Sequence, residues 1–178
     1  GENMNIRRFK QVEEQNGFVS SYIHAEGKIG VLVDVETDVV NDEIKEMAKN
    51  IAMQITAMKP VYTNDSEVDE EYKSKGLEII KSQIENDPKM AGKPEKVING
   101  AIMGRLNKQL KEICLLDQVY VKAEDGKQSV AAYVAQVAKA NNAKVAVKGF
   151  VRFETGEGME KKNEDFAAEV AAQMAAAK

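Results

Sequence analysis

The feature that most constrains this fold is a charged, helix-forming block at residues 65–114, between two strand-rich stretches. The segments "SEVDEEYKSKGLEIIKSQIEN" and "PEKVINGAIMGRLNKQLKEIC" carry apolar residues at spacings of three and four, and "DPKMAGK" separates them. Two amphipathic helices joined by a short turn form an antiparallel hairpin. Because each apolar stripe is narrow, we expect the hairpin to project as a two-stranded coiled coil. The stripes are Val68, Tyr72, Ile79, Ile80 and Ile84, and Val97, Ile98, Ala101, Ile102, Leu106, Leu110 and Ile113.

The stretch before the hairpin predicts a small antiparallel sheet. Residues 3–15, 18–27 and 28–37 each have the composition of a strand. The tight-turn signal Asn16-Gly17 separates the first two, and Gly27 separates the second from the third. This spacing predicts a three-stranded meander with residues 18–27 at its centre.

The remaining elements predict helices packed on that sheet, in an α+β fold. Apolar residues repeat at three and four between the N-cap Asn41 and Pro60, which indicates a helix covering one sheet face. After the hairpin, residues 115–121 are expected to return as a short strand or extended segment. A helix follows the Asp125-Gly126 turn, and a strand follows the helix. We expect one face of this strand to be buried and to consist of Val145, Val147, Val151 and Phe153.

We therefore expect a discontinuous α+β body at 1–64 and 115–155, a hairpin at 65–114, and a helical module at 156–178. The terminal helix begins near Asn163, and Phe166, Val170 and Met174 follow at four-residue steps among alanines. These three side chains have two possible partners. An amphipathic helix usually packs on its own core, but this narrow ridge also fits a groove on another protein.

Composition excludes several functional classes. The formal net charge of −4 argues against binding to nucleic acid, which favours a basic surface. No apolar run approaches the roughly 20 residues of a membrane span, and "GENMNIRRF" lacks the apolar core of a signal peptide. The single cysteine fits a reducing cytoplasm. The absence of an initiator Met leads us to expect a start inside a longer protein.

The residues do not predict an enzyme, a cofactor or a metal. The only histidine is His24, and the adjacent Ser20 and Ser21 alternate between the faces of a strand. A contact imidazole is therefore the favoured interpretation over a catalytic triad. The "GEG" turn lacks the third glycine of a nucleotide-binding loop, and a lone cysteine, Cys114, is better suited to a buried position than to metal ligation.

Six short stretches in order resemble bacterial elongation factor Ts, the nucleotide-exchange partner of elongation factor Tu. They are "GENMNIRR", "GKIGVLV", "IAMQITAMKP", "LLDQVYV", "GFVRFETGEGMEKK" and "DFAAEVAA". Together they extend from one end of the chain to the other. The resemblance implies the second core subdomain of the family, its coiled-coil insertion and its carboxy-terminal module.

The resemblance also implies a partner and its contact residues. It suggests that the terminal-helix residues Phe166, Val170 and Met174 pack on the nucleotide-binding domain of elongation factor Tu, and that His24 meets its third domain. The family's "TDFV" motif, whose Asp-Phe disturbs the bound magnesium, is missing from this sequence. We therefore expect partner binding more than GDP release. The alternative is an interaction or dimerisation module without exchange activity, which self-associates through the hairpin or the sheet edge.

Overall fold

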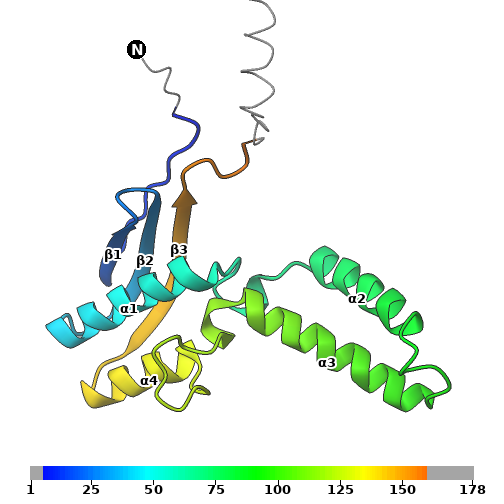
Figure 1. Ribbon diagram of the computed structural model, residues 1–178. Helices are drawn as coiled ribbons and strands as arrows, with labels where there is room; N and C mark the ends of the chain where they lie inside the picture. The colour runs from blue at the N-terminus through cyan, green and yellow to red at the C-terminus, as the bar shows by residue number, and fades with distance from the viewer. Residues whose placement is uncertain (1–5, 160–178) are drawn as a thin grey trace, which may run out of the picture.

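The computed structural model describes residues 6–159 and has the α+β fold that the sequence predicts (Figure 1). The strands β1 (Gly17–His24), β2 (Ile29–Thr37) and β3 (Val145–Glu154) form an antiparallel sheet in the order β1-β2-β3. Helices pack on one face of this sheet, and a helical hairpin extends away from it.

The predicted meander is wrong in its first strand and in its centre. Residues 6–14 form no regular secondary structure, and the central strand is β2, with β1 at an edge. The position beside β2 is taken by β3, which is rich in Val and Phe, whereas "RRFKQVEEQ" is mostly polar. Gly17 opens β1 at a close approach: a Cβ atom there would lie 2.0 Å from the Val35 carbonyl oxygen.

A bulge in β3 overturns part of the predicted strand alternation. Asp34 pairs with Gly149, but the next residue of β2, Val35, pairs with Val147. Because of the extra residue, each later side chain of β3 lies on the opposite face of the sheet from the one that simple alternation predicts. Phe150 and Arg152 therefore share the helix-covered face with Val145 and Val147. Val151 and Phe153, which we expected on that face, lie on the other one, called the outer face below.

Helix α1 (Asp42–Met58) covers the inner face of the sheet. Its predicted cap is confirmed, because the Asn41 side chain accepts a hydrogen bond of 2.9 Å from the Ile44 N–H. The helix ends at Lys59, whose φ of 49° is left-handed. The buried core formed by α1, the sheet and the returning chain is Val31, Val33, Val35, Ile44, Met47, Ala48, Ile51, Ala52, Ile55, Leu115, Tyr120, Val130, Val134 and Val147.

The chain that returns from the hairpin forms no strand, contrary to one of the two forms that we expected. It begins with the 3-10 turn η2 (Leu115–Asp117) and continues without regular structure to α4 (Val130–Ala140). Its anchor is the buried side chain of Gln54, which donates to the Val119 carbonyl at 3.0 Å and accepts from the Val121 N–H at 2.8 Å. A side chain of α1 thus adds to the antiparallel bridge that this segment makes between Val119 and Ser129.

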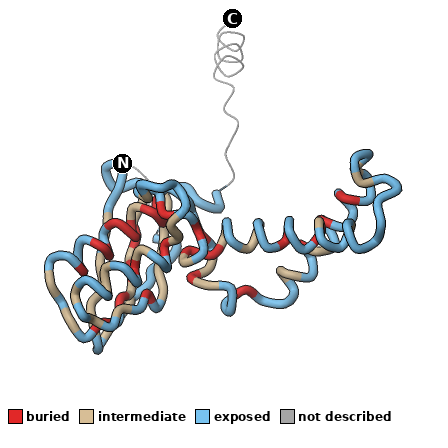
Figure 2. Tube along the Cα trace, turned by 90° about the horizontal axis from the view of Figure 1, so that it is seen from below, coloured by how far each residue is buried: buried red, intermediate tan, exposed pale blue. Residues whose placement is uncertain are grey.

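The predicted hairpin is present, as α2 (Glu70–Glu85) and α3 (Glu95–Ile113), after the short 3-10 turn η1 (Asp65–Glu67). It extends sideways from the body in both views (Figures 1 and 2). The helices approach closely at Gly76, where an added Cβ would lie 3.7 Å from Leu106 Cδ1. The predicted stripe is too wide, since Ile79 and Val97 are exposed. The buried cluster between the helices is Ile80, Ile84, Ile102 and Leu106, and Val68 is buried just before α2.

Candidate partner-binding surface

His24, the histidine predicted to contact a partner, lies exposed at the end of the edge strand β1. The following turn has positive φ angles at Ala25 (50°), Glu26 (55°) and Gly27 (92°). Two non-glycine residues in this left-handed region are uncommon, so the turn has a tightly specified shape. The Lys28 N–H donates to the Ala25 carbonyl at 3.1 Å and closes it. The imidazole therefore stands at a corner of the sheet that no other described segment covers.

Tyr22 orients this imidazole. Residues two apart on a strand share a face, and the Tyr22 hydroxyl lies 3.1 Å from Nδ1 of His24. The two ring centroids are 5.9 Å apart. With Nδ1 engaged by the phenol, Nε2 is the nitrogen left for a hydrogen bond to another molecule.

A charged cluster lies across the same end of the sheet. In the pairing register, His24 stands opposite Ile29, which in turn stands opposite Glu154 on β3. The Glu154 carboxylate binds Arg152 at 2.6 Å and Lys59 at 3.2 Å. These contacts, that of Arg152 above all, hold the pKa of Glu154 below its usual range.

We call Tyr22, His24, Lys59, Arg152 and Glu154 the His24 patch. Within it, the side chain of Arg152 is only 9% exposed, and its Nε is buried without a hydrogen-bond partner among the described residues. No local sequence pattern predicts this arginine as a site residue, because its inward position results from the β3 bulge.

Apolar side chains are exposed beside the His24 patch. Met58 and Val61, on either side of Lys59 and Pro60, are 48% and 59% exposed, and Ile23 is 66% exposed on the outer face. Aromatic and charged groups bordered by exposed apolar side chains are typical of a surface that binds another protein. Among the described residues, the hydrogen-bond partner of His24 is a phenol and not a carboxylate, so the orienting acid of a triad is missing there.

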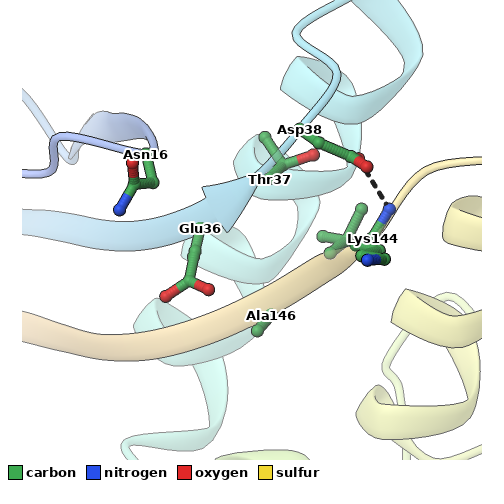
Figure 3. Close-up of a pocket in the computed structure, with 7 residues that line it drawn as sticks. Asn16, Glu36, Thr37, Asp38, Lys144 and Ala146 are labelled. Carbon is green, nitrogen blue, oxygen red and sulfur yellow. Dashed lines mark hydrogen bonds between the residues drawn. The ribbon is translucent and has the colours of Figure 1, made fainter.

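A shallow hollow at the opposite end of the sheet does not assemble reactive groups (Figure 3). It is lined by Asn16, by residues 36–38 and by residues 144–146. The Asp38 carboxylate accepts a bond of 2.7 Å from the backbone N–H of Lys144, and the Asn16 carbonyl accepts one of 2.8 Å from the Thr37 N–H. Of the other polar side chains in the lining, Glu36 binds Lys148 at 3.2 Å and the Thr37 hydroxyl donates to the Val39 carbonyl at 2.9 Å, so these groups close the sheet end.

The other predicted contact residues, Phe166, Val170 and Met174, lie outside the described residues, as does the terminal helix expected to carry them. Within residues 6–159, no cluster of three His, Cys, Asp or Glu side chains is arranged to hold a metal ion. In the same range, no helix is both long and apolar enough to cross a membrane. Cys114 is buried, as we expected, and burial raises the pKa of its thiol to about 11.

The fold places this chain in the class of α+β proteins whose body is interrupted by a helical hairpin. Comparison with known families makes the assignment specific: the family model of Elongation factor TS matches residues 1–157. The chain belongs to the elongation factor Ts family.

Individual relatives agree with this assignment. Elongation factor Ts of Clostridium acetobutylicum is 46% identical over 174 residues, and that of Clostridium botulinum (strain Eklund 17B) is 45% identical over 174 residues. Each alignment covers 98% of this chain and 55% of the relative. The chain therefore spans about half the length of the curated relatives that it matches.

Proposed function

We propose that this chain supplies a partner-binding surface of an elongation factor Ts, which binds elongation factor Tu in the cytoplasm and promotes GDP release. The observation that carries the proposal is the His24 patch, in which hydrogen bonds and ion pairs hold a group of side chains around an exposed His24, on a protein of this family. Its geometry supports recognition, because Tyr22 and the ion pairs around Glu154 orient the groups before a partner arrives.

An exchange factor needs a binding surface more than it needs reactive side chains. A protein that weakens GDP binding to its partner must, by linkage, bind the nucleotide-free partner more tightly by the same factor. The whole driving force for GDP release is the difference between the free energy of contact with the nucleotide-free partner and that with the GDP-bound partner. A rigid surface such as the sheet end at His24 can supply it.

Within this surface, we assign His24 a direct contact with the partner. Its strand position and the turn after it keep the ring exposed, while the phenol of Tyr22 keeps one nitrogen oriented. A preoriented side chain loses less conformational freedom on binding than a mobile one.

We also propose that Phe166, Val170 and Met174 are anchors for the nucleotide-binding domain of the partner. Support comes from their four-residue spacing in the sequence and from the alanines around them, which permit close approach of another helix. If this is so, Phe166→Ala weakens partner binding by about 2 kcal/mol or more and changes unfolding by less than about 1 kcal/mol. If the ridge packs internally, unfolding loses about 3–5 kcal/mol instead.

The proposal is tested by titrating the chain into elongation factor Tu loaded with a fluorescent GDP analogue. Binding and nucleotide release are recorded in the same experiment. Because the 178 residues contain no "TDFV", we expect weak binding with little acceleration of release. Release as fast as that produced by a full-length factor would contradict the expectation that this chain supplies binding rather than nucleotide displacement. Absence of binding would contradict the proposed function.

The second candidate is an interaction module that has no effect on nucleotide. The observation in its favour is the exposed apolar surface of the hairpin, where Ile79, Val97 and Met103 are 59%, 48% and 50% exposed. Sedimentation equilibrium distinguishes the two candidates. Self-association abolished by polar substitutions at these three positions, without any binding to elongation factor Tu, would favour the second.

A further inference from the structure

Residues 6–16 lie as a strap across the outer face of the sheet, opposite α1. At one end, the Arg7 side chain donates to the Glu157 carbonyl at 3.0 Å, and the Arg8 guanidinium carbon lies 4.6 Å from the centroid of the Phe153 ring. At the other end, the Asn16 carbonyl accepts the Thr37 N–H at 2.8 Å. Between them, the strap and the sheet enclose a shallow cavity whose lining includes Lys10, Gln11, Val12, Glu13, Leu32, Asp34, Gly149 and Val151.

Asp34 lies at the centre of this contact and lacks a hydrogen-bond donor. It is on the central strand, opposite Gly149 and next to the β3 bulge. Its Oδ1 is buried and has no partner among the described residues. An acceptor buried without a donor is unfavourable, and more so when it carries charge. The side chain facing Asp34 is the carboxyl of Glu14, from the strap.

The charged groups around this pair do not neutralise it. Lys148 on β3 is bound at 3.2 Å to Glu36, a second acidic residue near Asp34 on β2. From the strap, the cavity lining includes Lys10 and Glu13, of opposite charge. Two carboxylates that face each other without a cation between them favour the uptake of one proton.

The surroundings of the two carboxyls indicate which one takes the proton. Burial, followed by the contact with Glu14, raises the pKa of Asp34 above its ordinary value of 3.8. The backbone N–H of Asn16 donates to Glu14 at 2.7 Å and lowers the pKa of Glu14. Asp34 is therefore the site of protonation, and ionised Glu14 is the acceptor of the resulting hydrogen bond.

We propose that Glu14 and Asp34 form a proton-operated latch that holds the strap closed over the outer face of the sheet. When Asp34 takes up a proton from solvent, its hydroxyl donates to Glu14 and joins strap to sheet. When the proton leaves, two carboxylates repel each other at the same point and the strap loosens. The outer-face side chains beside it, Leu32 and Val151, then become accessible.

The sign of the pH dependence follows from the raised pKa of Asp34. Its contribution to the closed form is fully present below the ordinary value of 3.8 and is lost as pH rises through the higher pKa of the latched state. Glu14, whose pKa is lowered from its ordinary value of 4.5, has the opposite dependence: its contribution is present above 4.5 and is lost as pH falls through the lower value. Mild acidification from neutrality therefore tightens the strap before strong acid weakens it.

The test uses the whole chain and two NMR readouts. Carboxyl carbon shifts report the titration of Asp34 and Glu14, and hydrogen exchange reports the protection of the 6–16 amides after correction for the intrinsic pH dependence of exchange. We expect Asp34 to titrate above its ordinary pKa of 3.8, and protection to be roughly three- to tenfold higher below that titration than above it, as for one hydrogen bond gained. An ordinary Asp34 titration, or protection that does not change with pH, would overturn the latch.

Matched variants separate the latch from general loosening of the fold. Asp34→Asn keeps a donor facing Glu14 at every pH, so it should remove the pH dependence and retain the protection. Glu14→Gln removes the strap's carboxyl from the pair, so it should also abolish the pH dependence of protection. This variant keeps the test valid if the Asp34 variant does not fold. Glu13→Gln, at the exposed neighbouring position, should leave the pH dependence intact. A dependence that survives in both Asp34→Asn and Glu14→Gln would contradict the proposal.

Discussion

The body and the helical hairpin differ in how they are stabilised. The buried core of the body draws on the sheet, on α1, on η2 and on α4, which come from both sides of the insertion. The buried cluster of the described hairpin has four residues, two from each helix. In Figure 2 the buried positions are concentrated in the body and sparse along the arm. Regions with few buried apolar contacts open at lower free energy than a core, so the two regions should respond differently to equivalent substitutions.

The largest effect is expected from removing apolar volume in α1. Ile51 is 0% exposed, and Ile51→Ala should reduce the free energy of unfolding of the body by about 2–5 kcal/mol. Urea denaturation followed by circular dichroism measures this loss.

The matched substitution in the hairpin is Ile84→Ala, at a residue that is 2% exposed. It should increase amide hydrogen exchange in α2 and α3 while leaving protection of the sheet unchanged. If both variants lower the protection of the sheet equally, the two regions form one cooperative unit and the comparison fails.

The next effect concerns the junction between the two regions. Gln54 bonds Gln118 and the backbone at Val119 and Val121, and Gln118 in turn donates at 2.7 Å to the Glu112 carbonyl in the last turn of α3. Gln54→Leu keeps the volume but removes the bonds to two part-buried backbone groups and to the buried Gln118 side chain, so it should destabilise the body by about 2–4 kcal/mol. Thermal denaturation checks this value.

The control for that substitution is Gln136→Leu. Gln136 is exposed, and its contact is with Gln128 on the surface. The change should stay within about 0.5 kcal/mol. An equal loss in both variants would mean that the effect arises from the added apolar surface rather than from the buried amide.

A smaller effect is expected from shortening the hairpin itself. Its base is held by bonds from the Val61 and Tyr62 N–H groups to the Ile113 carbonyl, and from the Leu115 N–H to the Tyr62 carbonyl. Replacing residues 77–105 by a short Gly-Ser linker joins the helices where Gly76 approaches Leu106. Because loop-closure entropy varies slowly with length, the body should change by less than about 1 kcal/mol. Loss of the cooperative thermal transition would show that the hairpin belongs to the core.

The smallest effect is a local pH dependence at the hairpin tip. The backbone N–H of Lys89 donates to Asp87 at 3.0 Å, and Arg105 binds the same carboxylate at 3.2 Å. These contacts lower the pKa of Asp87. Its contribution is therefore present above the ordinary value of 3.8 and is lost as pH falls through the lower one. NMR shifts of the Lys89 amide should report this titration, and Asp87→Asn should abolish it without affecting the sheet.

The elements that sequence predicts well are those whose signals are local. Asn41 and Pro60 bracket α1, and the apolar spacing within it matches the buried face. The hairpin follows from two periodic segments and the turn between them, and the last strand follows from its Val-rich composition. Each of these signals lies within a few residues of the feature that it specifies.

The features that sequence missed depend on residues far apart in the chain. Strand order depended on whether the third strand was residues 3–15, added beside β1 as we predicted, or β3, added beside β2 from the far side of the insertion. The inward position of Arg152 depended on a bulge at Lys148 that appears only in the pairing of two strands. For the candidate site, His24 was predicted from the sequence as a contact residue, whereas Lys59, Arg152 and Glu154 around it were not.

The measurement that tests the account most directly is the affinity of His24→Ala for elongation factor Tu, together with its unfolding free energy. The account predicts binding weaker by tenfold or more, about 1.4 kcal/mol, with unfolding changed by less than about 0.5 kcal/mol because the side chain is exposed. Ser21→Ala, at an exposed position on the other face of the same strand, should change neither. Unchanged affinity of the folded variant, or a loss of several kcal/mol in stability, would contradict the claim that this sheet end is a binding surface.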